Sequence, residues 1–219
     1  MGFTNLTTKY IIKILSKFII ILIITSAFSI LTSFGKHYTP EQKKYIAEIK
    51  QQRKEKDDYM KNDPDSPFNQ DPKAHFQDLK YYDVNPDYVF KSKLYKYKIK
   101  DTVKIFGTKG EERKAVRLGY VKIYFKQGER NVNVYKSTSR NGETYYSIWF
   151  TDQTTGDETY GVGRYLDFDF NPDSNFIYTI DFNLAYSPYC SYSAKYSCAI
   201  PTKEDHIDVA IKAGEKRFH

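Results

Sequence analysis

Several features are missing from this sequence, and each absence removes a class of protein. It contains no dinucleotide fingerprint, no phosphate-binding loop and no internal repeat. Cys190 and Cys198 are the only cysteines, and with His206 as the one further ligand nearby they are too few for a zinc site. No arginine-rich cluster lies beside a recognisable nucleic-acid-binding fold, so the net charge of +7 indicates a lysine-rich solvated surface. We therefore expect no metal, no other cofactor and no nucleic-acid partner.

Aromatic residues, in contrast, are abundant. The 219-residue chain has 21 tyrosines and 15 phenylalanines. Aromatic and β-branched side chains fit a pleated, half-buried surface, so this composition favours β structure. The length suits one domain with appendages and is sufficient to bury a core.

Residues 1–35 contain three lysines followed by an apolar run from Phe18 to Phe34. A basic segment before such a run is typical of an export signal or a membrane anchor. As a helix the run would cover roughly 25 Å, slightly less than a hydrocarbon core of ~30 Å. Ser33-Phe34-Gly35 fits a cleavage site, so both interpretations stay open, although we favour the anchor. No cysteine lies near the end of the run, which excludes a lipoprotein.

Both interpretations predict the same location for the rest of the chain. The lysines precede the apolar run, so the positive-inside rule places everything after Lys36 outside the cytoplasm. We therefore expect an exported protein that is anchored in the cell envelope, periplasmic or secreted. The membrane is then a partner through residues 1–35.

Residues 36–66 predict a charged helical spacer. Thr39 can cap a helix and Pro40 fits its first turn, so we expect a mostly solvated helix from about Pro40 to Met60. The segment NDPDSP then ends it. The thin apolar stripe of this helix consists of Tyr45, Ile46, Ile49 and Arg53.

Residues 67–219 predict a mainly β domain. From Tyr81 onward the sequence indicates seven to nine short strands with turn signals between them, which favours an antiparallel sandwich or a barrel-like domain. Asn141-Gly142 is a strong hairpin signal because both residues tolerate positive φ. In the final strand, the side chains of Ile207, Val209 and Ile211 are expected to point into the core.

Two alternating stretches stand near the middle of this domain. RYLDFDF, residues 164–170, points its apolar residues one way and its tyrosine and aspartates the other. The turn NPDSN leads to a second alternating stretch, FIYTIDFN, at 176–183. We predict that the two form a hairpin with one continuous apolar face. Asp167 and Asp181 would then be diagonal neighbours on the polar face, roughly 7 Å apart.

This polar face allows three interpretations. In the first, the polar residues cluster in a cleft, where repulsion between the two carboxylates keeps one of them protonated. In the second, the face is a solvated sheet surface. The third interpretation is a structural hydrogen-bond network that includes Arg164, Asp152 or Glu158. Lysine is absent from residues 152–194 of this basic chain, which marks the region as unusual.

The cysteines lie in a tyrosine-rich loop with Tyr186, Tyr189, Tyr192 and Tyr196. In an oxidising compartment a nearby pair is a disulfide candidate, so we expect a Cys190–Cys198 bridge. Rings with polar tips suit carbohydrate or aromatic ligands, but they serve equally well as loop packing.

Four blocks of the sequence resemble the bacterial and archaeal family known as domain of unknown function 1684: DDYMKNDPDSPF, FQDLKYYDVNPDY, DQTTGDETYGVGRYLD and DFNLAYSPYCSYSAKYSCAIPTKEDHIDVAIKAGEK. The resemblance covers residues 53–217. The positions that fit the family pattern are Thr154, Gly156, Glu158, Thr159, Tyr160, Gly161, Gly163, Arg164, Tyr165, Asp181, Phe182, Asn183, Pro188, Tyr189, Cys190 and Cys198. Ser187, Ala199, Thr202 and Asp205 depart from it. The resemblance implies one domain and no established activity.

We favour an exported binding module for a small polar or carbohydrate-like ligand. Its pocket would be formed by the 152–165 loop, the 181–183 strand and the Cys190–Cys198 loop. The predicted ligand-binding residues are Asp152, Thr154, Tyr160, Arg164, Tyr165, Asn183, Tyr186 and Tyr189.

Two alternatives remain. The first is a hydrolase with Asp181, Glu158 and Asp167 as catalytic carboxylates, or His206 as a base. The second is a structural envelope protein whose polar segments only stabilise turns. The sequence leaves the oligomeric state open.

Overall fold

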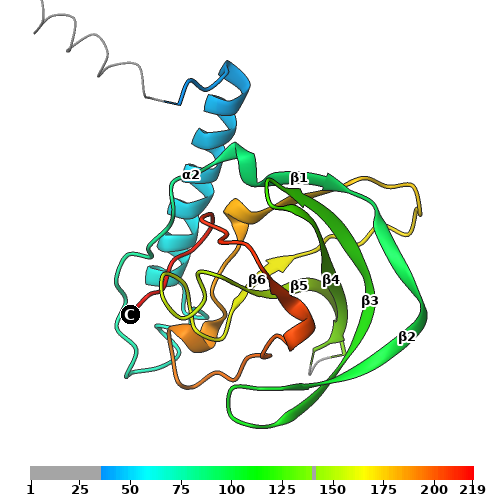
Figure 1. Cartoon of the computed structure of the whole chain (residues 1–219). Coiled ribbons are helices and arrows are strands. Elements are labelled where there is room, and N and C mark those ends of the chain that lie inside the picture. The colour runs from blue at the N-terminus through cyan, green and yellow to red at the C-terminus, as the bar shows by residue number, and fades with distance from the viewer. Residues whose placement is uncertain (1–35, 140–141) are drawn as a thin grey trace, which may run out of the picture. The chain divides into compact units, whose positions relative to one another are not determined.

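The computed structural model describes residues 36–139 and 142–219 (Figure 1). The predicted signal or anchor at 1–35 lies outside them, as does Asn141 of the predicted hairpin turn. Within the described part of the chain, no helix combines the length and the apolar character that a bilayer crossing requires. One α-helix is described, α2 (Pro40–Asn62), and it confirms the predicted start at Pro40.

The strands form two sheets. The larger has six strands in the order β2-β3-β4-β5-β6, with β8 beside β5, and the smaller pairs β1 with β7. Figure 1 shows the long strands β2, β3 and β4 curving together. In chain order the strands are β1 (Val89–Ser92), β2 (Leu94–Phe106), β3 (Glu112–Phe125), β4 (Gly128–Thr138), β5 (Thr144–Asp152), β6 (Arg164–Asp167), β7 (Tyr178–Asp181) and β8 (His206–Ile207). Short 3-10 helices are η1 (Pro86–Tyr88), η2 (Phe182–Leu184), η3 (Tyr189–Ser191) and η4 (Lys203–Asp205).

The prediction of a mainly β fold is confirmed. All strand pairs are antiparallel except β5 with β8, which are parallel. The larger sheet is open among the described residues, because its order runs from β2 to β6 without a bond between these two strands. The structure therefore shows no closed barrel, and a barrel-like domain was one of the two architectures that the sequence predicted.

Both faces of the sheet centre are covered. On β5, Ile148 and Phe150 join the main core, whereas Trp149 between them packs in a second cluster with Tyr135. Such a two-sided arrangement follows from the alternation of side chains along a strand. The C-terminal segment contributes the predicted inward residues Ile207, Val209 and Ile211 to the main core, although only its first two residues are a strand.

The predicted hairpin between 164–170 and 176–183 is wrong. β6 pairs with β5, placing Leu166 opposite Ile148, and β7 pairs with β1 in the smaller sheet. The predicted apolar alternation is nevertheless present, and Phe168 stacks on Tyr178 with ring centroids 4.4 Å apart. Alternation determines which face is buried but not which strand supplies the hydrogen bonds, so Asp167 and Asp181 are not cross-strand neighbours.

Helix α2 packs on the β domain along one face. The expected stripe is present, and it extends to Met60, which is buried with Phe68 and Tyr192. Arg53 donates hydrogen bonds to the carbonyl oxygens of Tyr82 (2.7 Å) and Asn183 (3.2 Å). The rest of the helix surface is largely solvated, as expected.

Candidate ligand-binding cleft

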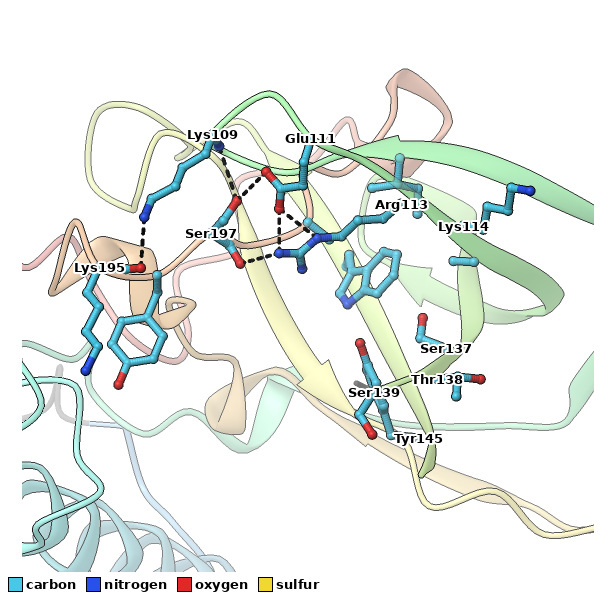
Figure 2. A pocket seen from close by; sticks show the side chains of 15 residues that line it. Lys109, Glu111, Arg113, Lys114, Ser137, Thr138, Ser139, Tyr145, Lys195 and Ser197 are labelled. Carbon is cyan, nitrogen blue, oxygen red and sulfur yellow. Dashed lines mark hydrogen bonds and ion pairs between the residues drawn. The ribbon is translucent and has the colours of Figure 1, made fainter. Parts of the chain in front are cut away.

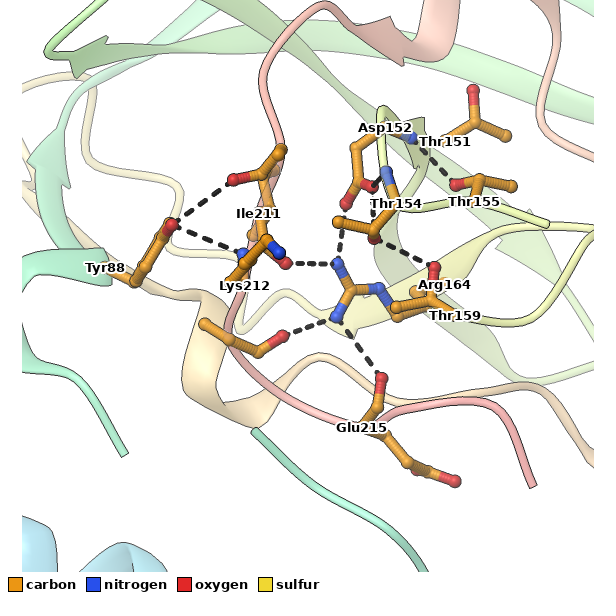
Figure 3. A network of polar contacts seen from close by, with 12 residues as sticks. Tyr88, Thr151, Asp152, Thr154, Thr155, Thr159, Arg164, Ile211, Lys212 and Glu215 are labelled. Carbon is orange, nitrogen blue, oxygen red and sulfur yellow. Dashed lines mark hydrogen bonds and ion pairs between the residues drawn. The ribbon is translucent and has the colours of Figure 1, made fainter. Parts of the chain in front are cut away.

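Arg164 is the centre of a buried network (Figure 3). Its Nη2 lies 2.6 Å from Oδ2 of Asp152, and neither side chain has any exposed surface. Arg164 also donates to the carbonyl oxygens of Ile211 (2.9 Å), Ala213 and Glu215 (3.3 Å). The guanidinium therefore joins β5 and β6 to the C-terminal segment.

Thr154, from the same 152–165 loop, completes this network. The backbone amide of Thr154 donates to Oδ1 of Asp152 at 2.6 Å, and the Thr154 hydroxyl donates to the same oxygen. Gly163, before Arg164, has φ +113°, and a Cβ atom there would lie 2.6 Å from the carbonyl oxygen of Phe150. Glycine is therefore required for β6 to approach β5 directly before Arg164. Asp152, Thr154 and both Nη groups of Arg164 find partners within the protein, whereas Nε of Arg164 has none among the described residues.

Glu158 and Tyr160 lie elsewhere. Glu158 forms an ion pair of 2.7 Å with Lys212, whose hydrogen bond lowers the pKa of the Glu158 carboxyl. The Tyr160 hydroxyl donates to the carbonyl oxygen of Cys190 at 3.3 Å. His206, the other candidate base, is exposed and contacts Thr151 through its Nδ1 at 3.1 Å.

Asp181 and Asn183 connect the small sheet to helix α2. The Tyr45 hydroxyl donates to Asp181 at 2.6 Å, and the backbone amide and side chain of Asn183 both donate to the other carboxylate oxygen at 2.9 Å. Asn183 also exchanges hydrogen bonds with the backbone of Asn85. Asp181 borders a separate hollow of about 520 Å³, which Asp167 also lines.

A larger cleft lies over the other face of β4, β5 and β6. It consists of two hollows of about 890 and 880 Å³. Both hollows are lined by Arg113, Ser139, Tyr145, Trp149, Tyr196, Ser197 and Ala199, so they form one continuous cleft.

The register of the strands explains the cleft floor. Ser147 on β5 lies opposite Tyr135 on β4 and Asp167 on β6. Ser137 lies opposite Tyr145, and Trp149 opposite Tyr165. Residues directly opposite one another point to the same side of a sheet, so these seven side chains share one face.

Tyrosines form much of the cleft wall. The predicted residues Tyr165, Tyr186 and Tyr189 all line it. The Tyr186 hydroxyl donates to Asp167 at 2.7 Å, and burial together with this carboxylate raises the pKa of the phenol. Tyr189 packs edge-on against Tyr196 at 5.2 Å. Tyr145 is 45% exposed and offers the most open ring, whereas Trp149 is stacked on Tyr135 and only 4% exposed.

A charged pair stands at one end of the cleft (Figure 2). Arg113 donates twice to Oε1 of Glu111, at 2.6 and 2.9 Å, and once to the carbonyl oxygen of Ser197. The hydroxyl of Ser197 donates to the other oxygen of Glu111 at 2.8 Å, and this bond is the largest cause that lowers the pKa of the Glu111 carboxyl to about 2. Three lysines, Lys109, Lys114 and Lys195, line the same end.

Two serine hydroxyls on the cleft floor have no hydrogen-bond partner among the described residues. Ser137 is 7% exposed and Ser147 is 3% exposed, and each lines one of the two hollows. Most buried polar groups in proteins are hydrogen-bonded, so an orphan hydroxyl calls for an explanation such as a missing water or ligand.

Both cysteines are free thiols in the structure. The predicted bridge is thus not formed here, although the two residues are in contact: the backbone amide of Cys190 lies 3.2 Å from the sulfur of Cys198. Cys198 lines the cleft.

The sequence matches one known protein family. The sequence pattern of a family described as "Protein of unknown function (DUF1684)" matches residues 74–216. The chain belongs to this family. The solution NMR structure of an uncharacterised protein from Haloarcula marismortui is similar to it, with a TM-score of 0.58 and 26% identity over 80% of this chain and 96% of the other. No curated protein matches the chain.

Two departures from the DUF1684 pattern have clear structural positions. Asp205 is buried, and it accepts hydrogen bonds from Asn133 (2.9 Å) and Tyr135 (2.7 Å) on β4. Ala199 lines the cleft, and its carbonyl oxygen accepts the hydroxyl of Tyr165. Asp205 thus holds β4 through hydrogen bonds, and Ala199 borders the candidate site.

The structure brings together only part of the predicted site. Tyr165, Tyr186, Tyr189 and Asp167 meet in the cleft, whereas Arg164, Glu158 and Asp181 occupy three other places. Sequence reasoning missed Arg113, Tyr145, Ser147 and Trp149, which lie on β3 and β5, two strands in which it named no site residue. The alternation along residues 145–150 could have revealed this site. Tyr145, Ser147 and Trp149 share one polar and aromatic face of the strand, while the apolar Ile148 and Phe150 lie on the opposite face.

Proposed function

We propose that this protein binds a small carbohydrate-like ligand in the cleft over β4, β5 and β6. Sugars present apolar ring faces and hydroxyl edges, and sites for them combine aromatic rings with a few polar groups. Here Tyr145, Tyr189 and Tyr196 supply the rings, while Asp167 and Arg113 supply charged hydrogen-bonding groups.

The observation that carries this proposal is the pair of unpartnered hydroxyls of Ser137 and Ser147. They lie on a cleft floor next to aromatic side chains, where a ligand hydroxyl would give each of them a partner. If the cleft floor served only for packing, alanine would be the more stable residue at these two positions. A buried hydroxyl without a partner lowers the stability of the protein by about 1–3 kcal/mol.

The hydrolase alternative has weaker support. Of its three predicted carboxylates, only Asp167 lines the cleft, and Tyr186 already donates to it. Glu158 and Asp181 are bonded to other parts of the protein. Our proposal is therefore binding without turnover.

We also propose, from the basic and apolar character of residues 1–35, that the cleft works outside the cytoplasm. Protease treatment of intact cells that express the full chain tests this location. Digestion of residues 36–219 without lysis, or after outer-membrane permeabilisation, supports export. Protection until the inner membrane is broken contradicts it.

Trp149 makes the binding proposal directly testable, because it is the only tryptophan of the chain and lines the cleft. The full-length protein is titrated with maltotetraose, cellotetraose, chitotetraose and, given the lysines at one end of the cleft, tetragalacturonate. We expect a saturable change in fluorescence with at least one of them. Ser147→Ala should weaken that binding by about 3–10-fold, the equivalent of one hydrogen bond.

Tyr145→Ala should abolish most of the affinity, and Tyr124→Ala is its matched control because Tyr124 is an exposed tyrosine outside the cleft. Calorimetry repeats the titration without relying on Trp149. Absence of a saturable signal with all four sugars, or equal affinity of the two tyrosine variants, refutes the proposal.

A further inference from the structure

The two cysteines lie together beside the cleft, and Cys198 lines its wall. Cys190 is in η3 and Cys198 lies between the cleft residues Ser197 and Ala199. Both cysteines are partly exposed. The backbone amide of Cys190 donates to the sulfur of Cys198 at 3.2 Å, and the Tyr160 hydroxyl donates to the sulfur of Cys190 at 3.8 Å.

The surroundings shift the pKa values of the two thiols in opposite directions. The hydrogen bond from Cys198, with further ones from Tyr160 and Thr108, lowers the pKa of the Cys190 thiol to about 7. The same pairing and burial raise the pKa of Cys198. Near neutral pH a substantial fraction of the reduced pair therefore carries a Cys190 thiolate beside the Cys198 thiol, and the thiolate is the nucleophile.

We propose that Cys190 and Cys198 form a reactive dithiol, in which Cys190 attacks an organic disulfide and Cys198 then closes an intramolecular bridge at the cleft wall. The proposal is independent of any ligand in the cleft. It also differs from a permanent structural bridge, since it requires both states to be accessible.

The reaction balances with a disulfide such as oxidised glutathione. The Cys190 thiolate attacks one sulfur, the S–S bond breaks, and one glutathione leaves as a thiolate. Cys198 gives its proton to that thiolate and attacks the Cys190 sulfur, which expels the second glutathione; this one takes a proton from solvent. Two protein thiols are oxidised by two electrons, and one disulfide is reduced to two thiols.

Reversibility follows from the hydrogen bonds that the two sulfurs accept, from the Tyr160 hydroxyl at Cys190 and from the Cys190 backbone amide at Cys198. These bonds stabilise the reduced form, and stabilisation of the reduced form makes a disulfide easier to reduce. The bridge should accordingly form and open within the range that glutathione controls.

The test equilibrates the full-length protein in buffers that run from fully reduced to fully oxidised glutathione. Each sample is quenched with acid, alkylated and weighed intact. We expect one transition in which both alkylation sites disappear together, a Cys190–Cys198 peptide in the oxidised form, and the same curve from either direction. Persistent thiols, two separate glutathione adducts, or a bridge that reduced glutathione fails to open each overturn the proposal.

Single variants test the assigned roles. In Cys198→Ser, Cys190 should accumulate a mixed disulfide with glutathione, whereas in Cys190→Ser the remaining thiol should react at least about tenfold more slowly. The alkylation rate of Cys190 should have its pH midpoint near 7 in wild type. Cys198→Ala should move it toward the ordinary thiol value of about 8.5, and Cys198→Ser, which keeps a donor, should move it less. Equal reactivity of both cysteines refutes the assignment.

Discussion

Arg164 is the residue on which the interior depends most. A buried charge loses several kcal/mol of hydration, so it is tolerated only where its donors find partners. Asp152 and three carbonyl oxygens provide them for the two Nη groups, and those carbonyls lie 47, 49 and 51 positions along the chain. Lysine would carry the same charge, but one ammonium group cannot reproduce the planar fork of a guanidinium.

We expect Arg164→Met to lower the free energy of unfolding by about 3–5 kcal/mol, because it leaves Asp152 charged and buried without its partner. Urea denaturation followed by Trp149 fluorescence measures this loss. Arg130→Lys, a conservative change at a partly exposed arginine that donates only to a backbone carbonyl, serves as the control and should stay within about 0.5 kcal/mol of wild type. A loss of less than about 1 kcal/mol for Arg164→Met would contradict the structural role.

The same residues show the limit of the sequence prediction at this scale. Asp152, Thr154 and Arg164 are the residue types that hold polar ligands, and the sequence places them together in a lysine-free stretch. The same types also satisfy buried backbone carbonyls, here those of a distant segment. Only the fold shows which partner they have.

At the scale of elements, alternation predicted the burial of four apolar residues correctly and the strand partners incorrectly, while Phe176 of the expected apolar face is 40% exposed. Leu166, Phe168, Tyr178 and Ile180 are buried as expected. β6 and β7 nevertheless pair with β5 and β1, since hydrogen bonds between strands are made by the backbone, which is the same at every residue. The short turn between the two stretches favoured a hairpin that the structure does not contain.

Helix α2 gives a prediction at the element scale. Met60 is buried among Phe68, Leu79 and Phe218, so Met60→Ala should destabilise the protein by about 2–5 kcal/mol. Lys50→Ala, on the exposed face of the same helix, is the control and should have little effect. Chemical denaturation measures both. Equal stability of the two variants would mean that the helix does not dock on the domain in solution.

At the scale of the molecule, the C-terminal segment completes the interior. Ile211 and Ala213 are fully buried in the main core, and Phe218 packs in the cluster beneath α2. A chain that ends at Ala210 loses these side chains and all three carbonyls that accept from Arg164. We expect it to lack the near-ultraviolet circular dichroism of a fixed tryptophan, whereas removal of the exposed His219 alone should leave that signal intact. A native signal from the shorter chain would contradict this.

The place of that segment has a consequence for biosynthesis. Residues 211–215 follow Arg164 by 47–51 positions, so the ribosome adds them after the strands. Arg164 is therefore synthesised well before the carbonyls that it finally contacts. The native interior forms only once these later residues have also left the ribosome.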